Sequence, residues 1–118
     1  FKAWILTGKD SAYKMSVCGG ALVLADAGFL EGKRATTNRN AFKALEPFVV
    51  QVLKQRVVED GEVITAGGVS ASLDMGLYLV HKIAGPDAME EIRAQMEYNG
   101  FEHAKVESFG EPLKVAQR

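Results

Sequence analysis

The stretch Lys14-Met15-Ser16-Val17-Cys18-Gly19-Gly20-Ala21-Leu22-Val23-Leu24 passes directly from an extended run into a run of small and apolar residues. This pattern predicts a strand over residues 13–17 and a helix over residues 19–27, with Cys18 at the turn between them. A residue at such a turn is lifted out of the sheet, and the glycines that follow let a substrate approach. The positive end of a helix favours the thiolate, the reactive form of cysteine. Cys18 is therefore a candidate nucleophile, with a small buried hydrophobe as the alternative.

Composition predicts one soluble globular domain and excludes several function classes. The chain has 118 residues, of which 47% are hydrophobic and 25% charged. A net charge of −1 gives no basic surface for nucleic acid. A single cysteine, with no signal-like segment and no long apolar run, predicts no disulfide, no membrane partner and a cytoplasmic location. The two histidines and one cysteine lack metal-site spacing, so neither a metal nor another cofactor is predicted.

The remainder of the chain alternates strand and helix signals. The sequence predicts a strand over residues 34–37, a short helix capped by Asn40, and a hairpin at Asp60-Gly61 that joins a valine-rich run to residues 62–65. This order is typical of an α/β domain in which helices cover a mostly parallel sheet of about four strands. The domain is expected to occupy residues 1–98, and the polar residues 99–118 are expected to form a tail that docks or is partly disordered.

Two helices are predicted after Gly67-Gly68. The first spans about residues 70–84 and ends at Gly85, and the second begins at Pro86. Their predicted buried faces are Leu73, Leu77, Val80 and Ala84 in the first helix and Met89, Ile92 and Met96 in the second. Gly67 and Gly68 precede a helix start. Three interpretations are open: they hold an anion, they line a cleft, or they only satisfy backbone geometry.

Several of these segments together resemble the ThiJ/PfpI family of the class I glutamine-amidotransferase-like superfamily. The resemblance runs through residues 16–37, then Val63-Ile64-Thr65-Ala66-Gly67-Gly68-Val69 with Asp74, residues 81–86 and residues 95–98. It is strongest to the branch that contains isonitrile hydratase. The resemblance implies a flavodoxin-like three-layer α/β sandwich, commonly a homodimer. It also implies that Cys18 is the nucleophile and that the Gly19 amide contributes to an oxyanion hole.

The resemblance covers the C-terminal part of that domain. The family's opening βαβ segment has no counterpart before Phe1, so a central strand is expected to have an unpaired edge. Association with a second copy or with a complementary fragment is therefore predicted.

The chain departs from the family pattern at two further positions, one directly after the cysteine and one after the paired threonines Thr36 and Thr37. Gly19 stands where many members have threonine, and Asn38 stands where many have histidine. Asparagine cannot act as a general base, so no cysteine–histidine pair is predicted, and a glyoxalase-like or deglycase-like activity is disfavoured. The preferred hypothesis is hydration of a small electrophilic substrate through Cys18, with Asn38, Gly67 and Gly68 lining the binding site. The alternative is a non-catalytic redox sensor or interaction module of the same fold.

Overall fold

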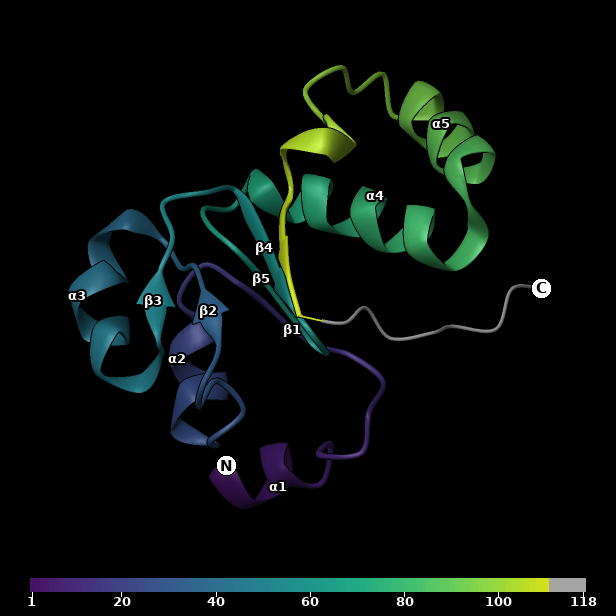
Figure 1. Cartoon of the computed structure of the whole chain (residues 1–118). Helices are drawn as coiled ribbons and strands as arrows, with labels where there is room; N and C mark the ends of the chain where they lie inside the picture. Colours follow the sequence, from purple (N-terminus) through teal and green to yellow (C-terminus); the bar gives the residue numbers. More distant parts are fainter. Residues whose placement is uncertain (111–118) are drawn as a thin grey trace.

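Strands and helices alternate along the chain in the computed structural model, which describes residues 1–110 (Figure 1). In chain order the elements are α1 (Lys2–Leu6), β1 (Lys14–Val17), α2 (Gly20–Asp26), β2 (Arg34–Ala35), η1 (Arg39–Ala41), α3 (Phe42–Leu45), η2 (Glu46–Phe48), β3 (Gln51–Val52), β4 (Val57–Asp60), β5 (Val63–Ala66), α4 (Ala71–Ala84), α5 (Pro86–Gln95), η3 (His103–Lys105) and β6 (Glu107–Phe109). None of the described helices is long and apolar enough to cross a membrane.

The main sheet has four strands in the order β1-β5-β4-β6. β1 runs parallel to β5, and β4 runs parallel to β6, whereas β4 and β5 form the predicted antiparallel hairpin. Asp60 pairs with Val63, so the hairpin loop consists of Gly61 and Glu62, and Gly61 adopts a φ of 62°. A left-handed residue at this position matches the twist of the two strands. β2 and β3 form a separate parallel pair.

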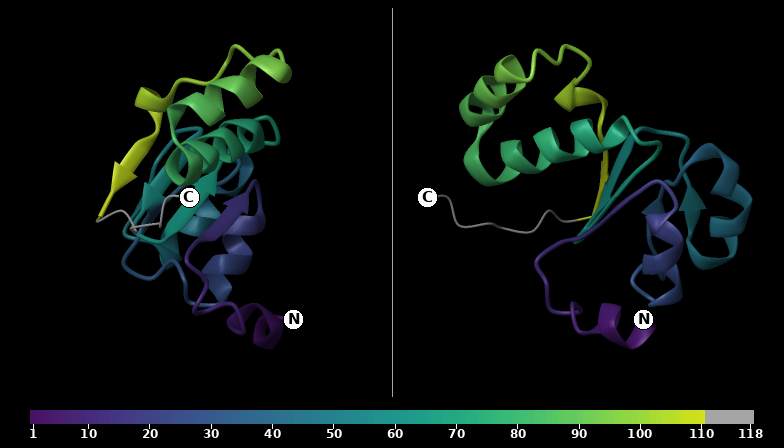
Figure 2. Two further views of the ribbon diagram at one scale, coloured as in Figure 1. Left: turned by 90° about the vertical axis from the view of Figure 1, so that its right-hand side faces the viewer. Right: turned by 180° about the vertical axis from the view of Figure 1, so that it is seen from behind.

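Helices cover both faces of this sheet, and each face has its own core (Figures 1 and 2). One core lies between the sheet and α4 and includes Ile64, Met75 and Tyr78. The other lies under α2 and α3 and includes Leu24 and Leu45. The two cores confirm the predicted three-layer α/β sandwich with a mostly parallel sheet.

A buried carboxylate joins three elements on the α4 face. Glu59 of β4 is 1% exposed, and its Oε1 accepts hydrogen bonds from the Tyr78 hydroxyl at 2.7 Å and from the Ser108 hydroxyl at 2.8 Å. Its Oε2 forms an ion pair with Lys82 Nζ at 2.8 Å. Burial raises the pKa of Tyr78, and the bond that this hydroxyl donates to Glu59 raises it further. The cluster fastens β6 to β4 and α4.

Three sequence predictions about the helices need correction. Asn40 does not cap a helix through its side chain, because it lies inside η1, and α3 begins after Ala41. Leu73 is 40% exposed, because α4 turns Ala71, Met75 and Tyr78 toward the sheet instead. In α5 only Met89 is buried, and the remainder of the predicted stripe, Ile92 and Met96, is 39% and 42% exposed, respectively.

The chain after Asn99 docks on the sheet as far as it is described. Residues 103–105 form a 3₁₀ turn, and β6 adds an edge strand beside β4 in register Val58↔Glu107. Residues 111–118 of the predicted tail lie outside the described residues.

Candidate functional site

Cys18 stands at the turn between β1 and α2, as the sequence predicts. Its φ of 56° lies in the left-handed region, which a non-glycine residue adopts only when its surroundings hold it there. The side chain is half-buried. The helix that follows the turn, α2, contains seven residues.

Bonds from two distant segments fix the backbone of Cys18. Its amide donates to the carbonyl of Gly67 at 2.7 Å and to that of Ala66 at 3.1 Å. Its carbonyl accepts a bond from the Thr37 hydroxyl at 2.7 Å. Thr37 is 1% exposed, so this bond is sheltered from water. The elbow is therefore anchored to β5 on one side and to the segment after β2 on the other.

Gly19 directly follows the cysteine, whereas Asn38 reaches it only through Thr37, whose hydroxyl binds the Cys18 carbonyl. Gly19 is exposed, and its amide donates no hydrogen bond to any described residue, so it is available to an oxygen of a substrate. A Cβ at Gly19 would meet nothing within 4 Å, so the position has room for a side chain. Asn38 is half-buried, and its Oδ1 lies 3.4 Å from Thr37 Oγ1. Thr37 thus lies between Asn38 and the Cys18 backbone.

The two predicted glycines after β5 differ in their surroundings. Gly67 is buried and belongs to the elbow, because its carbonyl accepts from Cys18 and its amide donates to the carbonyl of Arg56 at 2.9 Å. That amide is occupied, so Gly67 supplies no free donor for an anion. Gly68 is exposed and starts the turn into α4.

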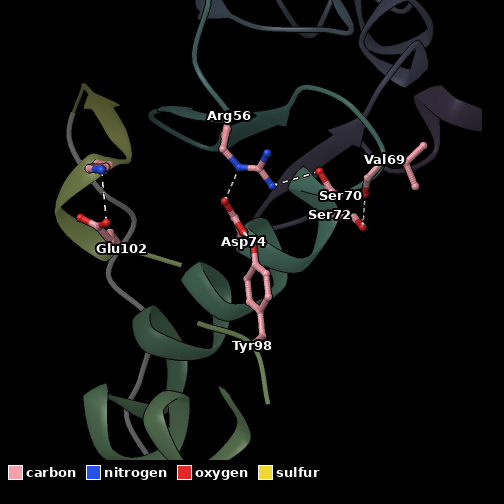
Figure 3. Close-up of polar contacts among 8 residues, drawn as sticks. Arg56, Val69, Ser70, Ser72, Asp74, Tyr98 and Glu102 are labelled. Atoms are coloured by element: carbon pink, nitrogen blue, oxygen red, sulfur yellow. Dashed lines mark hydrogen bonds and ion pairs between the residues drawn. The ribbon is translucent and has the colours of Figure 1, made fainter. Parts of the chain in front are cut away.

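A second polar cluster lies at the start of α4 (Figure 3); the sequence indicated only its acid, Asp74, and not the partners Arg56 and Tyr98. Asp74 is 5% exposed and accepts hydrogen bonds from Arg56 Nε at 2.6 Å and from the Tyr98 hydroxyl. The bond to Asp74 raises the pKa of both Arg56 and Tyr98. The sequence signal for these partners was the position of Asp74 on the same helical face as the buried Ala71 and Tyr78, because a buried carboxylate needs a partner.

Neither the Cys18 elbow nor the Arg56–Asp74–Tyr98 cluster forms a metal centre among the described residues. Within residues 1–110 no group of three or more histidine, cysteine, aspartate or glutamate side chains is arranged to hold a metal ion. Thr37, whose hydroxyl binds the Cys18 carbonyl, and Asn38 beside it carry groups that suit hydrogen bonding rather than metal ligation.

Comparison with known proteins agrees with this architecture. The model of the DJ-1/PfpI family matches residues 8–82, which include β1, the Cys18 elbow, the β4–β5 hairpin and most of α4. The chain belongs to the DJ-1/PfpI family. A crystal structure of a ThiJ/PfpI family protein from Pseudomonas syringae superposes with a TM-score of 0.75 at 36% sequence identity, over 80% of this chain and 39% of that one. The flavodoxin-like α/β fold is thereby shown.

Two curated relatives point to different uses of the same fold. An isonitrile hydratase from Pseudomonas putida is 42% identical over 89 residues, which is 75% of this chain and 39% of that enzyme. An HTH-type transcriptional regulator, CdhR, from Pseudomonas aeruginosa is 37% identical over 78 residues, which is 64% of this chain and 23% of the regulator. The chain therefore spans less than half the length of each of these relatives.

Proposed function

We propose that this chain carries the nucleophile of an isonitrile-hydratase-like enzyme, with Cys18 attacking a small electrophilic carbon. The observation that carries the proposal is the elbow itself: a half-buried cysteine at a φ of 56°, fixed by Gly67 and Thr37, beside the unoccupied amide of Gly19. The 42% identity to isonitrile hydratase supports this choice of substrate class. A fixed amide of this kind stabilises a developing negative charge by about 3 kcal/mol in other enzymes.

For an isonitrile, the balanced reaction has two stages. The Cys18 thiolate attacks the terminal carbon, and the proton lost by the thiol ends on that carbon, which gives a thioimidate. Water then adds to the same carbon, the carbon–sulfur bond breaks, and an N-substituted formamide leaves as the thiol is restored. The side chains of Thr37 and Asn38 do not titrate near neutral pH, so the proton reaches the carbon through water or through a group outside this pair.

The test compares Cys18→Ala and Cys18→Ser with the parent in turnover of cyclohexyl isocyanide. Cys18 is the only cysteine of the chain, so labelling by iodoacetamide reports its exposure without interference. Both variants should lose turnover while retaining the far-UV circular dichroism of the parent. Undiminished turnover in Cys18→Ala, or a parent chain that does not hydrate the substrate, would refute the mechanism.

A second candidate function is a non-catalytic sensor or interaction module in which Cys18 is oxidised. The similarity to a transcriptional regulator favours it, as does Asn38, which cannot serve as a base for the thiol. Intact-mass spectrometry after mild peroxide should then show addition of oxygen to the parent and none to Cys18→Ser. An unmodified parent would exclude a peroxide sensor.

A further inference from the structure

The chain after Asn99 is fastened to α4 by a stack of two imidazole rings. In Figure 1 this part of the chain returns from α5 past α4 and enters the sheet as β6. The His103 ring, in η3, lies 3.9 Å from the ring of His81 in α4, measured between ring centroids, and their planes are 27° apart. The Tyr78 ring lies 5.2 Å from that of His103, and Phe101 meets it edge-on at 6.5 Å. Neutral rings in such arrangements attract one another.

The charges around this stack disfavour imidazolium. Lys82 follows His81 in α4, and its Nζ already pairs with Oε2 of Glu59 at 2.8 Å. Within residues 1–110 neither histidine forms an ion pair with a carboxylate. Protonation of both rings therefore places two positive charges side by side, next to a third on Lys82, and like charges at this distance repel. The titratable groups around the pair are Tyr78 and Lys82 on α4, Glu59 on β4, and Glu102 and Lys105 in the segment itself.

The position of the His103 ring acts in the same direction. Burial lowers the pKa of His103, the electrostatic effects of His81 and Lys82 lower it further, and Glu59 opposes them. The ring is therefore protonated at a higher pH when the segment is released than when it is docked. Docking is strongest above the ordinary imidazole pKa of about 6.5, and it weakens as the pH falls below that value.

Few other contacts hold this segment, so it can open without the remainder of the sheet. β6 has three residues, and two of its side chains are exposed. The bond from the Ser108 hydroxyl to Glu59 at 2.8 Å and the Arg34 guanidinium over the Phe109 ring at 4.5 Å add to the strand pairing. Phe101, which is 8% exposed, anchors the loop before η3. Segments with few buried contacts open at the low end of the range of local stability, and β1, β5 and β4 stay paired with one another when β6 leaves.

We propose that η3 and β6 form an acid-released latch, in which protonation of the stacked His81 and His103 frees residues 100–109 from α4 and from the edge of β4. Release uncovers the backbone of residues 58–60, with which β6 pairs when it is docked. An uncovered strand edge accepts another strand, so the latch controls whether this edge is open to a partner. The latch stands independently of the chemistry proposed for Cys18.

Hydrogen exchange of the 118-residue chain at pH 7.5 and pH 5.5 tests the latch, with rates converted to opening constants so that the pH dependence of exchange itself cancels. The reporters are the amides of residues 107–109 and the Gly61 amide, which donates to the Phe109 carbonyl at 2.9 Å. Their opening constants should rise by about three- to tenfold at pH 5.5, since an imidazole with a pKa of about 6.5 contributes at most about tenfold over this range. At both pH values they should exceed by at least about tenfold the opening constants at the amides of Lys14 and Cys18, because the segment opens while the sheet stays folded.

Matched variants assign the pH response to the stack. His103→Phe keeps an aromatic ring without the proton, so the opening constants at residues 107–109 should change less than about twofold between the two pH values. His103→Gln lacks both ring and proton and should be equally insensitive to pH, so it keeps the test decisive if phenylalanine packs poorly. Lys105→Gln removes an exposed cation outside the stack and should respond to pH as the parent does. A pH-independent opening constant in the parent, a parent-like response in both His103 variants, or residues 107–109 that open no more readily than Lys14 and Cys18 would overturn the proposal.

Discussion

Removal of the cation beside buried Glu59 tests how the sheet holds its last described strand. In Lys82→Met the Glu59 carboxylate, 1% exposed, loses the ammonium 2.8 Å from its Oε2 but keeps the hydroxyls of Tyr78 and Ser108 on Oε1. Removal of one member of a buried pair costs about 3–5 kcal/mol. Lys82 is 13% exposed, so water reaches part of the pair and we expect about 3 kcal/mol.

This loss corresponds to a large thermal shift. An unfolding entropy of about 2.1 cal/mol/K per residue gives about 0.25 kcal/mol/K for 118 residues, so the melting temperature should fall by about 12 °C. Urea unfolding followed by circular dichroism, at one fixed protein concentration, measures the free energy directly. The amides of β6 should lose hydrogen-exchange protection first, because Ser108 shares the carboxylate.

The matched control is the double variant Glu59→Gln/Lys82→Met. Glutamine retains an acceptor for Tyr78 and Ser108 but carries no charge, so most of the stability should return, to within about 1 kcal/mol of the parent. The reasoning is refuted if Lys82→Met costs less than 1 kcal/mol, or if the double variant is as unstable as the single one.

Three further predictions concern the elbow, the docked C-terminal segment and the free sheet edge. Thr37→Val should leave the Cys18 carbonyl without its donor and lower the free energy of unfolding by about 1 kcal/mol. Thr37→Ser, the control, keeps a hydroxyl and should retain most of the parent's stability. Equal losses for the two variants in urea unfolding would contradict this role of the hydroxyl. Burial lowers the pKa of His103, the electrostatic effects of His81 and Lys82 lower it further, and Glu59 opposes them. As the pH falls, the imidazole is therefore protonated in the unfolded chain at a higher pH than in the folded chain, so the free energy of unfolding should fall below about pH 6.5. The His103 ring lies 3.9 Å from that of His81, and His103→Phe should flatten the melting temperature between pH 7 and pH 5.5; an unchanged pH profile would count against this. β1 pairs only with β5 among the described strands, so we propose that the chain self-associates through this edge, and a compact monomer in size-exclusion chromatography would argue against it.

Much of the fold could be predicted because its signals are local. Turn chemistry located the Asp60-Gly61 hairpin to within one residue, and glycine with proline separated α4 from α5 at Gly85 and Pro86. The order of these elements was sufficient for an α/β sandwich. β6 was not predicted, because a three-residue edge strand with two exposed side chains has almost no hydrophobic pattern.

The site was predicted only in part, for a related reason. Cys18 could be placed at a turn from its neighbours in sequence, but the partners of that turn come from elsewhere in the chain. Thr37 reaches Cys18 across 19 positions and Arg56 reaches Asp74 across 18, and no local pattern contains either pairing. The predicted buried face of α5 was wrong because burial depends on neighbouring elements. α5 packs on α4 rather than on the sheet, so of Met89, Ile92 and Met96 only Met89 is buried.

The bonds that hold Cys18 make its geometry depend on tertiary structure. Its amide depends on Gly67 and its carbonyl on Thr37, and both contacts require loops to close before they form. β1 has no strand partner among the described residues until the β4–β5 hairpin exists. The left-handed turn at Cys18 therefore depends on contacts that come from other parts of the chain, not on its neighbours in sequence alone. A substitution at Gly67 or Thr37, far from Cys18 in sequence, thus changes the backbone that presents the thiol.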